Sequence, residues 1–170
     1  MAKSGENAVK AFLDSKGLRV EKIPERNIKT VDFAVYTKDG LAFYLEEKTL
    51  EPASQKWKSI DPIYQSIASH VHEAAKQFES VNPARKVPNV LSLTNLDPTR
   101  DVNDLFTALT GRAITRSGKI VRLEEFGKKE KTLNLIDLYL WFDVEELTGH
   151  IWEDEIEPNY EGILKQLFEL

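Results

Sequence analysis

Two strand-like segments separated by a tight turn constrain the fold of this chain more than any other feature. Residues 31–37 and 41–46 are rich in aromatic and aliphatic side chains, and they flank Lys38-Asp39-Gly40. A glycine at the end of a three-residue hairpin loop adopts the left-handed conformation that this turn requires. The pattern therefore predicts an antiparallel hairpin in which Thr37 pairs with Leu41.

This hairpin brings charged side chains together. With the predicted pairing, Asp32 lies directly across from Glu46, with Cβ atoms about 5 Å apart. Side chains alternate between the two faces of a strand, so Glu46 and Lys48 share one face and Glu47 points to the other. Two carboxylates this close repel each other unless a cation lies between them.

The remaining segments alternate between helical and strand patterns. A long helix is predicted at 62–81, with Asp61 as its N-cap and Pro62 as its first residue. Three further helices are predicted: one at about 5–15, with Ser4 as N-cap and Gly17 as stop, one at 102–110, with Asp101 as N-cap, and one from Tyr160 onward. Strands are predicted at 87–94 and 134–142, and a hairpin at 114–123. This alternation predicts one α/β domain over residues 1–170, with a mixed central β-sheet flanked by helices on both faces.

Composition limits the chemistry and the compartment. The chain has no cysteine, so disulfides, thiolate metal sites and cysteine nucleophiles are excluded. No apolar run approaches the length of about 20 residues that spans a bilayer, and the first residues lead into a helical pattern rather than a signal sequence. We therefore expect a cytoplasmic protein.

Charge is distributed unevenly along the chain. The net charge is −5, which opposes binding to a polyanion, but residues 1–90 sum to +2 and residues 91–170 to −7. A nucleic acid is therefore expected to contact the N-terminal half. The acidic part, an elaboration at about 132–170, is read as a solvated surface or as a docking surface for a protein partner.

The predicted hairpin suits a divalent-metal site. Mg²⁺ and Mn²⁺ prefer oxygen ligands, and Mg²⁺ binds through one or two carboxylates together with waters and substrate phosphate. We expect Asp32 and Glu46 to be ligands, with the carbonyl oxygen of Glu47 as a further one. Lys48 then orients the attacking water or stabilises charge on the phosphate.

This arrangement resembles the PD-(D/E)XK nuclease superfamily over roughly residues 5–95. The matching features are Gly5-Glu6 on the first helix, Val31-Asp32, and the triplet Glu46-Glu47-Lys48, followed by a long helix and a strand. The opening, with Gly17-Leu18-Arg19-Val20, is similar to Holliday-junction resolvases. Val31 replaces the name-giving proline. The resemblance implies a restriction-endonuclease-like fold, Mg²⁺-dependent hydrolysis of DNA, and a catalytic role for Glu6, Asp32, Glu46 and Lys48.

Several alternatives remain open at this point. An acidic residue two positions before a lysine occurs twice in the chain, so the triplet counts only in its hairpin context. Glu46 and Lys48 could instead form an ordinary surface ion pair. Glu6 could be a first-turn acid that the helix dipole favours.

The competing function is a catalytically inactive nucleic-acid-binding or protein-interaction module. An endonuclease is favoured over an exonuclease because the long helix lacks a Gln-x-x-x-Tyr element, and a homodimer is considered because duplex cleavage needs two active sites.

Other polar residues are weaker candidates. Lys56, Trp57 and Lys58 place two cations around an aromatic ring, which suits contact with phosphate and stacking on a base, or equally an anchoring tryptophan with two solvated lysines. His70 and His72 are expected on a solvated helix face, and His150 stands alone. Asp137 is read as a structural acid with a smaller chance of serving the site, and Asn95 as a cap of the following turn or a lining residue of the cleft.

Overall fold

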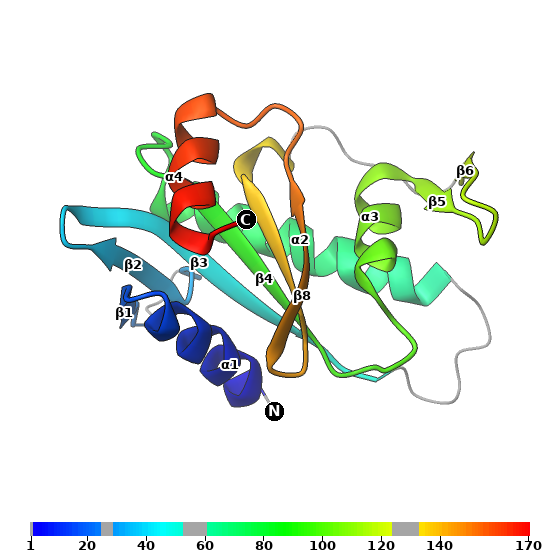
Figure 1. The fold of residues 1–170 in the computed structure, drawn as a ribbon, viewed down its shortest axis with the longest axis horizontal. Helices are drawn as coiled ribbons and strands as arrows, with labels where there is room; N and C mark the ends of the chain where they lie inside the picture. The colour runs from blue at the N-terminus through cyan, green and yellow to red at the C-terminus, as the bar shows by residue number, and fades with distance from the viewer. Residues whose placement is uncertain (1, 25–28, 53–60, 124–132) are drawn as a thin grey trace.

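A six-stranded mixed β-sheet forms the centre of the protein (Figure 1). The computed structural model describes the backbone of residues 2–24, 29–52, 61–123 and 133–170, and the side chains within 4–24, 29–52, 64–123 and 134–170. The strands, in their order across the sheet, are β1 (Arg19–Lys22), β2 (Phe33–Thr37), β3 (Gly40–Leu50), β4 (Asn89–Asn95), β7 (Leu138–Asp143) and β8 (Glu146–Trp152). β3, β4 and β7 run parallel, and the other neighbours pair antiparallel. The predicted α/β fold with a mixed sheet is confirmed.

Helices cover both faces of this sheet. One face packs on α1 (Ala2–Ser15) and α4 (Pro158–Phe168), through a core that includes Phe43, Leu140 and Phe168. The other face packs on α2 (Asp61–Val81) and α3 (Val102–Thr110), through a core that includes Phe78 and Trp141. All seven residues of β4 are buried, because a central strand covered on both sides has no solvent-facing row.

The β2–β3 hairpin forms as predicted, but its turn is shorter. Thr37 pairs with Gly40 rather than with Leu41, so the loop holds two residues, and Gly40 has a φ of 125°. The register then shifts between Val35 and Tyr36, because one additional residue of β3 is accommodated there as a bulge. The bulge restores the predicted pairing beyond it, where Phe33 is opposite Leu45. The prediction of the turn was therefore wrong by one residue, while the register next to Asp32 was right.

The helices begin and end within three residues of their predicted positions, but two predicted N-caps differ: α2 begins at Asp61 itself rather than at Pro62, and α1 begins before Ser4. α3 has the predicted N-cap at Asp101, whose side chain accepts a hydrogen bond from Asn103 N, and a capping box with Asp104. α1 begins at Ala2, so Ser4 lies inside the helix and the prediction of Ser4 as its N-cap was wrong. The predicted stop after α1 is confirmed at Gly17, which has a φ of 70°.

Two edge strands were not predicted, and one strand is shorter than predicted. β1 is a four-residue, largely exposed edge strand, and β8 is the opposite edge, with exposed and half-buried residues in alternation. Edge strands have one solvated side, so their sequences lack the apolar run that identifies central strands. The segment 134–142 is not one strand. A 3₁₀ turn, η1 (Leu133–Leu135), precedes it, and β7 starts at Leu138, after Asp137.

A separate two-stranded ribbon of β5 (Arg112–Ile114) and β6 (Ile120–Arg122) follows α3. It is the predicted 114–123 hairpin, and Gly118 in its turn has a φ of 77°. Among the described helices, none is long and apolar enough to cross a membrane.

Candidate functional site

The central part of β3 presents charged side chains to both faces of the sheet. Lys48 Nζ lies 2.8 Å from Glu46 Oε1 on the face that α2 covers. Glu47 faces α1, where its Oε1 accepts a hydrogen bond from the Thr49 hydroxyl at 3.0 Å. The predicted division of these side chains between the two faces is therefore confirmed. Glu46 is only 2% exposed, so it is not part of an ordinary surface ion pair.

Asp32 and the triplet exchange hydrogen bonds across the hairpin. The backbone N–H of Asp32 donates to Glu46 Oε2 at 3.0 Å, and the backbone N–H of Glu47 donates to Asp32 Oδ2 at 2.9 Å. Each carboxylate therefore uses one oxygen to satisfy the backbone of the opposite strand. This reciprocal pair holds the Asp32 and Glu46 carboxyl groups beside each other, as the predicted register requires.

Lys48 is oriented by α2. Its ammonium donates to Gln77 Oε1 at 3.0 Å and lies 3.8 Å from Glu73 Oε2. Gln77 in turn donates through Nε2 to the carbonyl oxygen of Thr30 at 2.7 Å. The Lys48 side chain remains 17% exposed, so it is held in place and still reaches solvent.

Burial changes the protonation of these carboxyl groups. It raises the pKa of Glu46 to about 7, and the charge of Asp32 adds to this rise, while Lys48 and Gln77 oppose it. Burial raises the pKa of Glu47 to about 7 as well. The pKa of Asp32 is also raised, again mainly by burial. Acids with raised pKa values that lie together mark candidate functional sites, because such a cluster is costly for stability alone.

α1 closes the site on the Glu47 side. A Cβ atom added to Gly5 would lie 2.1 Å from Glu47 Oε1, so this helix approaches the carboxylate as closely as glycine allows. Glu6, the next residue, forms an ion pair with Lys22 of β1. The Glu6 charge nevertheless adds to the raised pKa of Glu47. The Thr94 hydroxyl of β4 lies near Glu47 and lowers its pKa, but less than burial raises it.

The described residues do not form a preassembled multidentate metal site. No group of three or more His, Asp or Glu side chains within the described ranges is arranged to hold a metal ion. The chemistry of the donor set still suits Mg²⁺, which needs only one or two carboxylates when waters and substrate phosphate complete its shell. Asp32 and Glu46 supply that number. The Glu47 side chain is directed away from them, so its carbonyl oxygen is the atom that remains a predicted ligand.

Two residues of α2 at the site, Glu73 and Gln77, were missed from the sequence, and a third, His70, was placed on a solvated face. Glu73 and Gln77 contact Lys48, and His70 lies close enough for the Lys48 charge to lower its pKa, together with the larger effect of burial. Their spacing of i, i+3 and i+7 places them on one helix face, and this spacing was the available signal. His70 is half-buried and its Nδ1 has no hydrogen-bond partner, so the prediction of a solvated face holds for exposed His72 but not for His70.

The other candidates lie elsewhere. Lys56, Trp57 and Lys58 fall outside the described residues. His150 is exposed on β8, with its ring 5.9 Å from that of Trp152. Asn95 caps the turn after β4: its Nδ2 donates to the carbonyl oxygen of Asp97 at 2.9 Å, and its Oδ1 accepts from Asp97 N.

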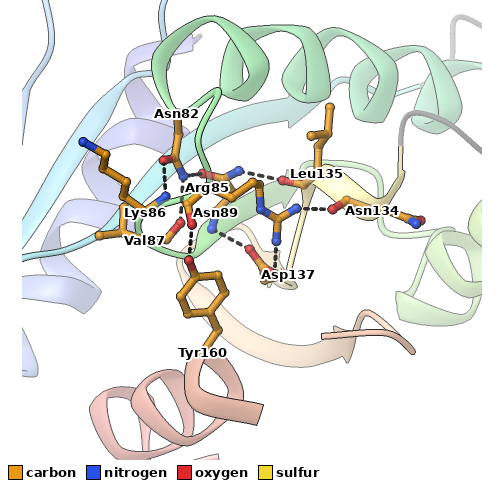
Figure 2. Close-up of polar contacts among 9 residues, drawn as sticks. All are labelled: Asn82, Arg85, Lys86, Val87, Asn89, Asn134, Leu135, Asp137 and Tyr160. Carbon is orange, nitrogen blue, oxygen red and sulfur yellow. Dashed lines mark hydrogen bonds and ion pairs between the residues drawn. The ribbon is translucent and has the colours of Figure 1, made fainter. Parts of the chain in front are cut away.

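Asp137 is a structural acid in a separate polar cluster (Figure 2). Its Oδ1 pairs with Arg85 at 2.5 Å, and its Oδ2 accepts from the backbone N–H of Asn89 at 2.8 Å. Arg85 also donates to the carbonyl oxygen of Asn134, and its own carbonyl oxygen accepts from Tyr160. The cluster joins the end of α2, the start of β4 and α4. It involves none of the β3 triplet in the contacts of Figure 2, so Asp137 has the structural role predicted first.

Comparisons with protein-family models, with curated proteins and with solved structures found no match to this chain.

Proposed function

We propose that this protein is a divalent-metal-dependent nuclease that hydrolyses phosphodiester bonds, with DNA as its substrate and endonucleolytic cleavage as its mode. The observation that carries the proposal is the convergence of Asp32, Glu46 and Lys48 on one face of the hairpin, with the pKa of Glu46 raised to about 7. A cation beside these two carboxylates would compensate the repulsion and the burial that raise their pKa values. The proposed family is the PD-(D/E)XK nuclease superfamily.

The residues have distinct roles in this proposal. Asp32 and Glu46 would hold Mg²⁺ or Mn²⁺, together with the Glu47 carbonyl oxygen. A bound metal of this kind supplies a water of lowered pKa and charge stabilisation at the phosphate. In the hydrolysis, a water oxygen forms a new bond to phosphorus and releases one proton to solvent, while the bond from phosphorus to the leaving sugar oxygen breaks and that oxygen takes up one proton from solvent. Lys48 stabilises the negative charge that develops on the phosphate oxygens.

Two further groups position this set. Gln77 fixes the Lys48 ammonium through the 3.0 Å hydrogen bond, so little reorganisation is needed when charge develops. Glu6 is close enough for its charge to raise the pKa of Asp32, but its carboxylate is paired with Lys22. This pairing favours a position for Glu6 outside the metal-binding carboxylates. Its predicted catalytic role is therefore the least supported of the four.

A second function has an observation in its favour. Asp32, Glu46 and Lys48 all have partners within the protein, and no three-ligand group is present among the described side chains. A catalytically inactive module on the same fold, which binds a nucleic acid or a protein, is compatible with these contacts. Activity of Lys48 variants distinguishes the two functions.

The test compares cleavage and binding for Lys48→Ala. Loss of a transition-state electrostatic partner lowers the rate by on the order of 10² to 10³, whereas loss of one phosphate contact changes affinity modestly. Single-turnover cleavage of linear, nicked, branched and single-stranded DNA in Mg²⁺ or Mn²⁺ gives the rate, and binding of the same DNA in Ca²⁺ gives the affinity. Lys76→Ala, an exposed lysine on α2, is the matched control. Wild-type cleavage by saturated Lys48→Ala, or no cleavage of any DNA by the wild type, would contradict the proposal.

A further inference from the structure

The ribbon of β5 and β6, with its flanking residues 111–123, stands apart from the central sheet (Figure 1). We call this segment the basic hairpin. Gly111 ends α3 in the left-handed conformation, with a φ of 65°, and its N–H closes the helix on the Thr107 carbonyl oxygen. Leu123 N donates to the Gly111 carbonyl oxygen at 2.8 Å, which closes the base of the ribbon. The hairpin is therefore a defined extension of α3.

Its charge is opposite to that of the surrounding chain. Residues 111–123 hold four cations, Arg112, Arg116, Lys119 and Arg122, and no acidic residue, although residues 91–170 sum to −7. All four are exposed, and none forms an ion pair with a described residue. Arg112 and Arg122 are directly paired across the ribbon. Like charges in this position are destabilising, so an anion bound between Arg112 and Arg122 would offset a repulsion that no described acidic residue offsets.

The same face carries exposed aliphatic side chains. Ile114 and Ile120 pair directly, two residues along from the two arginines, so all four side chains project from one face. Ile114 is 49% and Ile120 62% exposed. With Val121, they are three of the four large exposed hydrophobic residues in the described parts of the chain. The ribbon thus combines cations that form no ion pair with a described residue and exposed aliphatic side chains.

From these features we infer that the basic hairpin is a binding element for duplex DNA, inserted into a groove. A two-stranded ribbon fits the major groove of B-DNA, which is about 12 Å wide. The arginines would contact phosphates or guanine edges, and the isoleucines would contact thymine methyl groups or sugars. The deep, narrow major groove of duplex RNA does not admit a ribbon. The hairpin has no aromatic residue, which distinguishes it from elements that stack on single-stranded bases.

The duplex DNA bound by the basic hairpin would be the substrate of the carboxylate site, so this inference rests on the proposed nuclease function. Tyr64 of α2 lies beside Asp104 of α3, the helix that leads into the hairpin, whereas Gln77 at the site lies further along α2. The distance between these two positions of α2 is about 20 Å along the helix axis. A duplex that contacts both the basic hairpin and the carboxylate site would therefore extend over at least about six base pairs.

The test measures binding of a labelled DNA duplex by fluorescence anisotropy in EDTA, over a range of salt concentrations. Arg112→Gln with Arg122→Gln should lower affinity by on the order of tenfold and reduce the slope of log K against log salt by about 1.8. The double variant Ile114→Thr with Ile120→Thr keeps β-branched side chains. This variant should lower DNA affinity severalfold and leave the slope of log K against log salt unchanged. Lys10→Gln with Lys38→Gln removes two exposed cations on other elements and should change neither. Thermal melts confirm folding of each variant.

The outcomes separate this inference from the nuclease proposal. Equal effects of the hairpin and control variants, or wild-type binding to single strands or to duplex RNA as tight as to duplex DNA, would overturn it. So would sedimentation showing that the isoleucine variants dissociate a wild-type dimer while DNA affinity is unchanged, since the hairpin would then join two copies. Because EDTA removes the metal, none of these results depends on cleavage. Failure of the nuclease proposal appears in the Lys48→Ala rates instead.

Discussion

At the residue scale, the buried carboxyl group of Glu47 links stability to pH. Its pKa is raised from 4.5 to about 7 in the folded protein, so the folded state holds a proton that the unfolded state releases at lower pH. The stability of the metal-free protein should therefore fall as the pH rises from about 4.5 to 7.

The variant Glu47→Gln isolates this effect. Glutamine keeps an acceptor for the Thr49 hydroxyl but carries no charge. We expect it to be more stable than the wild type by about 3 kcal/mol at pH 7.5 and nearly equal to it at pH 4.5. Urea unfolding in a chelating buffer at both pH values measures the difference. If the difference in unfolding free energy between Glu47→Gln and the wild type were the same at both pH values, Glu47 would be hydrated rather than buried, since Glu46 and Asp32 titrate alike in both proteins.

At the element scale, the contact of α1 with β3 depends on one glycine. The Cβ of Gly5→Ala would meet Glu47 Oε1 at 2.1 Å and Thr49 Oγ1 at 2.7 Å, so either the helix or these two side chains must shift. We expect a loss of about 1–3 kcal/mol in the free energy of unfolding. Gly162→Ala in α4 is the matched control, because nothing lies within 4 Å of its new Cβ.

The control variant should have the opposite sign. Alanine at exposed Gly162 favours the helix by up to about 1 kcal/mol, so Gly162→Ala should be slightly more stable than the wild type. Chemical denaturation of both variants gives the comparison. If Gly5→Ala were as stable as Gly162→Ala, α1 would not be held against Glu47 as the structure describes.

Elements were predictable where their sequence patterns are local. The Asp101 cap and the Gly118 turn are set by neighbouring residues, so the sequence was sufficient to place α3 and the β5–β6 ribbon. β1 and β8 were missed because both are edge strands with a solvated side, so their sequences lack the apolar run that identifies a central strand. The bulge after Val35 could not be predicted either, since it compensates a turn one residue shorter than the sequence suggested.

At the scale of the whole molecule, metal binding should stabilise the fold. A ligand that binds only the folded state adds about 1.4 kcal/mol at ten times its Kd, or roughly 3–6 °C in Tm for a chain of this size. We expect this shift with Mn²⁺ or Mg²⁺ at millimolar concentration, because the two carboxylates that are available without substrate bind these ions weakly.

The variant Asp32→Asn should lose the shift in Tm, while its metal-free Tm stays equal or rises slightly as one of two adjacent acids becomes neutral. Calorimetry with and without each ion measures both effects. A large loss of metal-free stability in Asp32→Asn would instead identify Asp32 as a structural acid.

The division of the charged side chains between the two faces of β3 follows from the sequence alone, because side chains alternate along a strand and this separates Glu46 and Lys48 from Glu47. The pairing that brings Asp32 to Glu46 was also predicted, but the chain reaches it through a shorter turn and a bulge that no local pattern indicated. Tertiary structure alone decided their environment. The approach of Gly5 and Gln77, from helices on opposite faces, buries the carboxyl groups, raises their pKa values and orients Lys48. Such packing between segments distant in the chain depends on how all the side chains fill the two cores, which no local pattern encodes.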